Sequence, residues 1–241
     1  MHAIRLLLVE DDAVSAAFLA DALAALPAQV DVAGSIAAAR AAADAATHAL
    51  WLVDAHLPDG DGLACLRGLR QLRAATPALA LTAGAPQAEL DALCAGGYLE
   101  VLLKPVSVAL LQGTVRRLLG LAPLGDDGTR AAGARGGKLP AWEDRDALAA
   151  IGGNPDSLAK LRRLFLEELP AMRAQLASAQ SRSDADGVRA LVHKLRASCG
   201  FVGAARLGAA AAALSLAPLA AAARRDFEAA AGDTLAAAPQ S

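Results

Sequence analysis

The chain has 241 residues, 55% of them hydrophobic and 20% charged, which is the composition of a globular protein long enough for one large domain or two ordinary ones. Aromatic residues make up 3% and the net charge at pH 7 is −2, so neither a base-stacking surface nor a polyanion-binding charge balance is indicated. We therefore expect no nucleic-acid partner.

Cysteine usage and the N-terminus predict a cytoplasmic protein. The three cysteines (Cys65, Cys94 and Cys199) are odd in number and widely spaced, which argues against a disulfide framework or a zinc site. The apolar run at residues 4–9 ends at three acids and is too short for a membrane span. No membrane partner is expected.

Short apolar runs alternate with helical patterns in the first half of the chain. The strand candidates are residues 4–9, 30–33, 50–53, 79–82 and 98–103. The helix candidates are residues 13–26, 36–46, 63–73, 87–94 and 106–119. Strands that alternate with helices predict an α/β domain with a parallel sheet covered on both faces. We place this domain at residues 1–120.

Residues 121–141 are rich in Gly, Ala and Pro without an apolar period, which predicts a flexible linker. After it, at residues 142–241, no strand pattern is present. Asn154 and Pro155 are typical of a helix start, and the apolar period continues to Leu169, where Pro170 interrupts it. Further helices are expected at about 184–199, 204–216 and 218–237. The second domain is therefore expected to be an all-α four-helix bundle.

Chemically useful side chains fall at the ends of the predicted strands. Glu10 and Asp11 follow the first strand, Asp54 closes the third, Thr82 closes the fourth and Lys104 follows the fifth. In a parallel sheet these positions converge on one edge. Crowded carboxylates repel one another, and Mg²⁺ with its oxygen ligands relieves this. A lysine across from such a site suits phosphoryl transfer, in which a carboxylate can be the nucleophile.

The segments "LLLVEDD", "LVDAHLPDGDG", "ALTAG" and "LLKPV", in this order and spacing, resemble the receiver domain of two-component response regulators. The resemblance covers about residues 3–120 and implies a flavodoxin-like, doubly wound five-stranded parallel sheet. It implies that Asp54 is the phosphoacceptor. It further implies that Glu10, Asp11 and the backbone carbonyl of His56 hold Mg²⁺ with Asp54, that Thr82 binds a phosphoryl oxygen, that Lys104 neutralises its charge, and that Pro105 shapes the turn.

One position departs from the receiver pattern. Many receivers carry Tyr or Phe three residues before the lysine, where the ring moves with the threonine as a switch. Here this position is Val101, and Tyr98 lies three residues earlier. The aromatic switch is therefore not carried over. "DAHLPDGDG" lacks the ligand spacing of an EF-hand, so calcium is not expected.

His193 lies on the polar face of an amphipathic helix. On a helical wheel it is about 140° from the centre of the apolar stripe, so we expect it to face solvent. The stripe contains Val188, Leu191, Val192, Leu195, Cys199 and Val202. Arg189, Arg196, Ala197 and Gly200 share the face of His193 and form a candidate docking or phosphate-neighbouring surface. An ordinary exposed histidine is the alternative, and His2 and His48 are expected to be incidental.

"FLEELPAMRAQLASA" followed by "ALVHKLRASCGFVGAARL" resembles the histidine phosphotransfer (HPt) domain over about residues 142–217. The resemblance implies that His193 is the phosphorylated residue. The family commonly reads His-x-x-Lys-Gly-Ser, whereas Arg196 and Ala197 stand here before Ser198. Arginine keeps the positive charge, while alanine adds a methyl group at the docking face. Ser215 replaces a residue that is often acidic.

Together the two resemblances predict a phosphorelay protein without its own kinase domain. A sensor or hybrid histidine kinase is the expected donor to Asp54, and a downstream response regulator is a candidate partner of His193. The receiver itself is expected to catalyse its own phosphorylation and dephosphorylation. The sequence leaves open the direction of flow and an intramolecular contact between the domains. The alternative is a binding module in which phosphorylation of Asp54 gates the helical domain and His193 is not phosphorylated. A metal-dependent phosphohydrolase lacks a substrate-pocket motif.

Overall fold

The computed structural model describes residues 4–84, 86–122 and 139–238. The chain forms two compact units, Met1–Thr129 and Arg130–Ser241. Most of the predicted linker, residues 123–138, lies outside the described residues. Among the residues that are described, no helix combines the length and the apolar character needed to cross a membrane.

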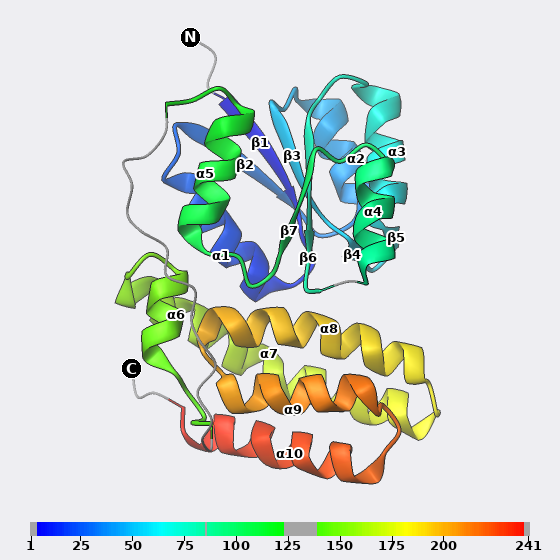
Figure 1. Ribbon diagram of the computed structural model, residues 1–241, viewed down its shortest axis with the longest axis vertical. Coiled ribbons are helices and arrows are strands. Elements are labelled where there is room, and N and C mark those ends of the chain that lie inside the picture. The colour runs from blue at the N-terminus through cyan, green and yellow to red at the C-terminus, as the bar shows by residue number, and fades with distance from the viewer. Residues whose placement is uncertain (1–3, 85, 123–138, 239–241) are drawn as a thin grey trace. The chain divides into compact units, whose positions relative to one another are not determined.

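The first unit is built on a five-stranded parallel sheet (Figure 1), as the sequence predicts. The strand order is β2-β1-β3-β6-β7. The five strands are β1 (Ile4–Val9), β2 (Ala28–Ala33), β3 (Leu50–Asp54), β6 (Ala78–Thr82) and β7 (Glu100–Leu103). All four strand pairs are parallel, so the carboxyl ends of the strands lie along one edge.

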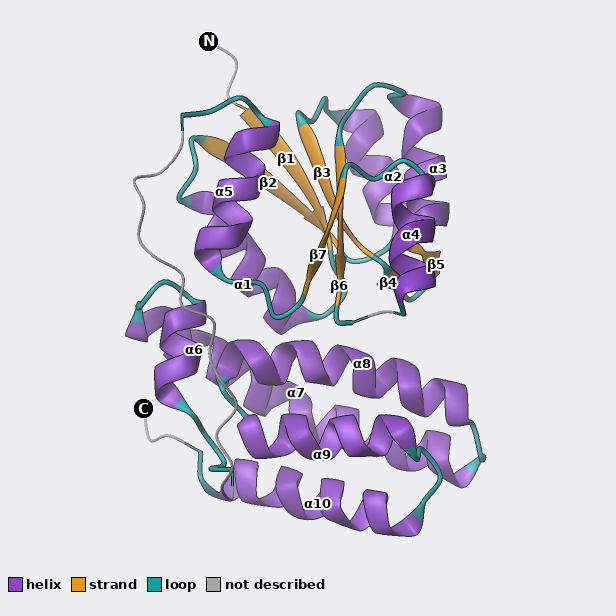
Figure 2. Ribbon diagram, viewed as in Figure 1, coloured by secondary structure: helices purple, strands orange, loops and turns teal. Residues whose placement is uncertain are grey.

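Helices cover both faces of this sheet (Figure 2). One face carries α1 (Ala13–Ala24) and α5 (Val108–Leu118), and the other carries α2 (Ile36–Ala45), α3 (Gly62–Leu72) and α4 (Gln87–Ala95). Because both faces are covered, the middle of each central strand is apolar, and polar residues such as Asp54 and Thr82 stand at the strand ends. Leu6, Leu7, Leu8 and Val9 are all fully buried. Burial of such a side chain contributes about 1.5–3 kcal/mol, which holds the strand ends in place beneath the site.

The loop after β3 forms a short hairpin that the sequence did not predict. It consists of β4 (His56–Leu57) and β5 (Gly60–Asp61). Asp59 accepts hydrogen bonds from the amides of Ile36 and Ala37, at 2.8 and 3.1 Å, and so adds to the cap of α2, whose N-cap residue is Ser35. Asp61 accepts one from the amide of Ala64 at 2.6 Å and caps α3. The acids of "LPDGDG" are therefore helix caps.

His48, expected to be incidental to the chemistry, takes part in a structural cluster in the sheet. Its side chain is fully buried, and Nε2 lies 2.8 Å from Oδ2 of Asp31. Arg5 donates to the same carboxylate through Nε and Nη2, at 3.1 and 2.8 Å. Although burial acts to raise it, these hydrogen bonds hold the pKa of Asp31 below its ordinary value of 3.8. The cluster joins β1, β2 and the loop that leads into β3.

The second unit is helical, as predicted. It contains α6 (Asp144–Ala150), α7 (Pro155–Ser181), α8 (Ala185–Val202), α9 (Ala205–Leu216) and α10 (Ala221–Ala236). Helices α7 to α10 pack in sequence, and α10 returns to α7, which makes a four-helix bundle. Asn154 caps α7 through its side-chain oxygen, as expected. The helix continues through Pro170 to Ser181 as a single element of 27 residues.

Helix α6, which the sequence did not predict, is fastened to the bundle at the end of α8. The amide of Glu143 donates to the carbonyl of Gly203 at 2.7 Å. Arg162 donates through Nε to the carbonyl of Val202 at 2.9 Å and pairs with Asp144 at 2.7 Å. Its guanidinium also stacks 4.9 Å from the Trp142 ring centre. These contacts connect α6, α7 and α8.

Candidate functional site

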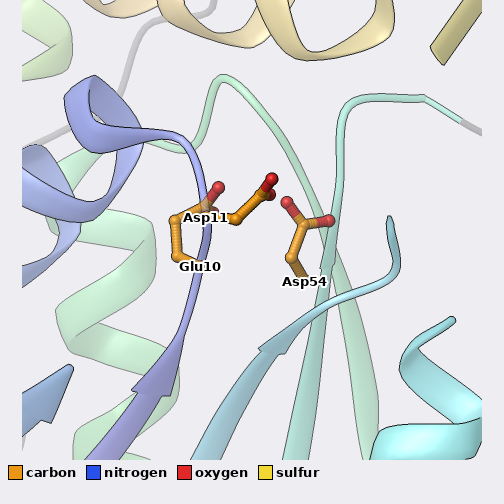
Figure 3. Close-up of side chains that lie close together, drawn as sticks. All are labelled: Glu10, Asp11 and Asp54. Carbon is orange, nitrogen blue, oxygen red and sulfur yellow. The ribbon is translucent and has the colours of Figure 1, made fainter. Parts of the chain in front are cut away.

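Three carboxylates meet at the carboxyl ends of β1 and β3 (Figure 3). Glu10 and Asp11 follow β1, and Asp54 is the last residue of β3. One oxygen from each lies within 4.8 Å of the others. In Figure 3 the carboxylates of Asp11 and Asp54 point toward one another. The structure thus brings together the acids that the sequence singles out.

The third acid after β1 has a separate task. Asp12 is the N-cap of α1, and its Oδ1 accepts a 2.7 Å hydrogen bond from the amide of Ser15. This capping bond directs the Asp12 side chain to the helix start. Glu10 and Asp11 are the members of the acidic run that face Asp54.

Lys104 completes the cluster from the end of β7. Its Nζ lies 2.6 Å from Oε2 of Glu10 and 2.6 Å from Oδ2 of Asp54. Burial alone lowers the pKa of Lys104, but the two carboxylates outweigh burial and hold that pKa above its usual range. Burial raises the pKa of Glu10 to about 8 against the pull of Lys104, and Asp54 adds to the rise. Three carboxyl groups therefore share one ammonium, and protonation of Glu10 lessens the repulsion among them.

This donor set fits a hard divalent cation. The cluster offers only carboxylate oxygens and carries an excess of negative charge, which are the features that Mg²⁺ sites share. His56 lies on β4 beside it, and its amide donates to Oδ1 of Asp54 at 3.1 Å. This bond holds the start of the hairpin against the proposed phosphoacceptor.

Thr82 ends β6 at the same edge of the sheet. It is fully buried, and no residue in the described part of the chain forms a hydrogen bond with its Oγ1. Its carbonyl accepts from the amide of Lys104 at 2.6 Å, so the two residues are directly joined. The Lys104–Pro105 peptide bond is cis. A buried hydroxyl without a partner fits a ligand oxygen, because leaving such a group unsatisfied costs free energy.

Tyr98 is buried, and β7 begins only at Glu100, two residues later than the sequence predicts. The Tyr98 hydroxyl donates a 2.6 Å hydrogen bond to the carbonyl of Gly62 at the start of α3. Val101, at the position of the family's aromatic residue, is half-buried. Sequence reasoning named Tyr98 but gave no sign of this bond, because its partner lies 36 residues away.

His193 lies in the middle of α8, in the second unit, and is half-buried rather than fully exposed. The helix has defined ends that fix this position. Asp184 caps its start by accepting from the amide of Gly187 at 2.8 Å, and Gly203 ends it with a left-handed φ of 74°. The predicted apolar stripe is buried apart from Leu191, which is half-buried.

The residues predicted to flank His193 differ in exposure. Arg189 and Arg196 are exposed, Gly200 is half-buried and Ala197 is 2% exposed. Arg189 pairs with Asp186 at 2.7 Å. Ser198 and Phe201 are also fully buried, so the buried part of α8 is wider than the apolar stripe. Helix α6, absent from the sequence prediction, also packs on α8.

Comparison with known families assigns both units. The family model of the response regulator receiver domain matches residues 6–116, and that of the Hpt domain matches residues 160–238. The chain therefore belongs to the two-component phosphorelay proteins. It carries a receiver domain followed by an Hpt domain.

Two curated relatives are much longer than this chain. The chain is 29% identical over 169 residues to the sensor histidine kinase GacS of Pseudomonas protegens. It is 26% identical over 167 residues to the signal transduction histidine-protein kinase BarA of Escherichia coli. These matches cover 67% and 66% of this chain but only 18% of each relative. The chain thus spans less than a fifth of the length of the kinases that it matches.

Solved structures of receivers align with about half of the chain. One is the receiver domain of the sensor histidine kinase PA1611 from Pseudomonas aeruginosa, solved with a magnesium ion in its active site cleft, with 29% identity and a TM-score of 0.46. It is covered over 99% of its length and covers 49% of this chain. A putative response regulator from Chloroflexus aurantiacus shares 27% identity, with a TM-score of 0.47 and coverage of 49% of this chain and 99% of its own.

Proposed function

We propose that this protein is a phosphorelay intermediate that accepts a phosphoryl group on Asp54 and exchanges it through His193. The observation that carries the proposal is the placement of Asp54 beside both Lys104 and the Glu10–Asp11 pair, in a chain that also carries an Hpt domain. Receiver and Hpt domains are chemically complementary, since one offers a carboxylate and the other an imidazole as phosphoryl acceptor.

The residues of the receiver have separable roles in this proposal. An oxygen of Asp54 attacks the phosphorus of a donor phosphohistidine, the P–N bond breaks, and the released imidazole takes a proton from solvent. Lys104 balances the charge of the phosphoryl oxygens, and the hydroxyl of Thr82 donates a hydrogen bond to one of them. Glu10, Asp11, Asp54 and the carbonyl of His56 hold Mg²⁺. When bound, the cation supplies further positive charge beside the phosphoryl group.

Transfer to the second unit reverses this chemistry. A ring nitrogen of His193 attacks the phosphorus of the Asp54 acyl phosphate, the P–O bond breaks, the carboxylate is regenerated, and the imidazole releases a proton. Exposed Arg196 lies one helical turn from His193, where a guanidinium suits phosphoryl recognition. Exposed Arg189 and half-buried Gly200 complete the proposed docking surface, whereas Ala197 is buried and takes no part in it. This exchange is proposed to occur inside the chain or with a partner response regulator.

The proposed donor is a sensor or hybrid histidine kinase, in line with the relatives' names. We place the protein in the cytoplasm, which is consistent with its three free cysteines. No nucleic-acid or membrane partner is proposed.

Label mapping tests the proposal. The chain is incubated with a phosphorylated histidine kinase, and the label is compared between the wild type, Asp54→Ala, His193→Ala and the control Asp44→Asn, whose carboxylate is exposed on α2. We expect base-labile label that requires Asp54 and acid-labile, base-stable label that requires His193. The control should match the wild type.

Label confined to Asp54 with every donor tried, including a phosphorylated response regulator, would contradict the relay. It would favour the alternative in which phosphorylation of Asp54 switches the helical domain as a binding module.

A further inference from the structure

Tyr98 connects three parts of the receiver domain. Its amide donates to the carbonyl of Leu93 in the last turn of α4 at 3.3 Å, and the next amide, of Leu99, donates to Ala78 at the start of β6 at 2.9 Å. Its hydroxyl reaches the carbonyl of Gly62 at 2.6 Å. The side chain is 3% exposed and belongs to the same core cluster as Ala55. The ring therefore has a fixed place and direction.

Gly62 is packed against the backbone of Asp54. A Cβ added to Gly62 would lie 3.0 Å from the carbonyl oxygen of Asp54 and 3.0 Å from the Cα of Ala55. The same Cβ would lie 3.2 Å from the Tyr98 hydroxyl oxygen. In addition, the amide of Gly62 donates to the carbonyl of Ala55 at 2.8 Å. The Gly62 peptide thus separates Tyr98 from Asp54 by the thickness of one residue.

The Gly62 peptide also closes the loop that contains the hairpin. The loop of residues 55–61 connects Asp54 to Gly62. It includes His56, whose amide donates a hydrogen bond to the Asp54 carboxylate. Burial raises the pKa of the Tyr98 hydroxyl above its usual range, so the hydroxyl remains a donor. The hydrogen bond from Tyr98 therefore fastens the far end of the loop to the core.

We propose that Tyr98 is a positioning residue for the phosphoryl chemistry of Asp54, acting through its hydrogen bond to the Gly62 carbonyl. This inference rests on the proposed function. By holding the Gly62 peptide, Tyr98 holds the 55–61 loop and with it the proposed cation-binding carbonyl of His56. Tyr98 lies three residues before Val101, and Val101 stands where many receivers carry an aromatic residue.

The test compares Tyr98→Phe with Thr114→Val, both in full chains that carry His193→Ala so that the phosphoryl group stays on Asp54. Thr114→Val removes a buried hydroxyl from α5 without loss of volume. A small acyl phosphate serves as donor: Asp54 attacks its phosphorus, and the donor carboxylate leaves. In hydrolysis, water attacks the phosphorus and the P–O bond to Asp54 breaks. The Asp54 carboxylate is regenerated, inorganic phosphate leaves, and the two protons of the water pass to the phosphate or to solvent.

We expect Tyr98→Phe to slow both phosphorylation and hydrolysis about fivefold, the effect of one lost hydrogen bond. The concentration of Mg²⁺ that gives half-maximal rate should rise, and the amides of residues 55–62 should exchange faster with deuterated solvent. Thr114→Val should leave rates and exchange in this loop unchanged.

Two outcomes separate the failure of this inference from that of the proposed function. If Tyr98→Phe lowers the melting temperature but leaves rates, Mg²⁺ dependence and loop exchange at wild-type values, Tyr98 is only structural and the inference is overturned. If even the parent chain takes no label on Asp54, the proposed function fails. Direct Mg²⁺ titration and hydrogen exchange of the 55–62 amides then decide the inference. Weaker Mg²⁺ binding and faster exchange in Tyr98→Phe than in the parent chain support it, and no change in either overturns it.

Discussion

Lys104 and Asp54 lie 50 residues apart in the sequence, yet Nζ of one lies 2.6 Å from Oδ2 of the other. The same ammonium lies 2.6 Å from Glu10. One buried cation therefore serves two buried carboxylates, which ties the ends of β1, β3 and β7 together.

Replacing Lys104 with methionine should lower the free energy of unfolding of the receiver domain by about 3 kcal/mol in the presence of a metal chelator at neutral pH. The reason is that removing one partner leaves buried carboxylates without a counter-charge. Urea denaturation measures this difference. Arg67→Met, an exposed change on α3, is the control and should fall within about 0.5 kcal/mol of the wild type. Equal stability of Lys104→Met and wild type would contradict the prediction.

Asp11→Asn should have the opposite effect on stability. It removes one of three mutually repelling carboxylates, so without divalent cation we expect the free energy of unfolding to rise by about 1 kcal/mol. The variant should also lose most of the rise in melting temperature that Mg²⁺ gives the wild type. Thermal denaturation with and without Mg²⁺ tests both parts. Persistence of the full Mg²⁺ effect in Asp11→Asn would show that Asp11 is not a ligand.

The Asp31 cluster predicts a contribution to acid stability. The folded-state pKa of Asp31 is held below its ordinary value of 3.8, so the folded protein binds this proton more weakly than the unfolded chain does. The resulting stability is present above the unfolded pKa and is lost as the pH falls through the folded one. The free energy of unfolding of Asp31→Asn should therefore be about 1 kcal/mol lower than that of the wild type at pH 7. Below about pH 4 it should fall less steeply with decreasing pH than that of the wild type.

Denaturation of wild type and Asp31→Asn across this range provides the measurement, with Asp44→Asn, an exposed change on α2, as control. If the free energies of unfolding of wild type and Asp31→Asn changed in parallel with pH, the prediction would be ruled out.

Gly203→Ala should loosen α6. Gly203 has a φ of 74°, and an added Cβ would lie 2.3 Å from the carbonyl oxygen of Glu143. We expect the free energy of unfolding of the Hpt domain to fall by about 2 kcal/mol or more, because backbone strain and a clash act together. Gly232→Ala is the matched control, since no atom lies within 4 Å of its added Cβ and it is inside α10.

Helix propensity predicts that Gly232→Ala stabilises the Hpt domain by about 0.5–1 kcal/mol. Trp142 lies two residues before α6 and packs beside Phe165, so its fluorescence reports on the attachment of α6 when it is measured in a Trp51→Phe background. An unchanged Trp142 signal and stability in Gly203→Ala would refute the role given to α6.

The sequence was sufficient for the sheet, its helices and the candidate acidic site because the rules involved are local or topological. Buried strands read as short apolar runs, and parallel strands bring their carboxyl ends to one edge wherever they sit in the chain. Glu10, Asp54 and Lys104 could therefore be grouped without any knowledge of distances. The roles assigned to His193 and its neighbours remain predictions.

What the sequence did not reveal depends on contacts between distant or very short segments. Helix α6 has only seven residues and no side-chain cap, so it lacks the usual start signal. The bond from Tyr98 to Gly62 and the pairing of His48 with Asp31 join residues that have no common periodicity. Asp59 and Asp61 resembled a ligand loop, and only the positions of α2 and α3 identify them as caps.

The hairpin after Asp54 has a consequence for how this gene can change in length. Surface loops usually tolerate insertions and deletions. Asp59 and Asp61 are exposed, but each must meet the amides at the start of a different helix, and one residue separates them. A single-residue insertion or deletion between them would break the Asp59 bonds to α2 or the Asp61 cap of α3, although Ser35 would still cap α2. We expect the spacing of these two aspartates to be preserved by selection more strictly than their exposure suggests.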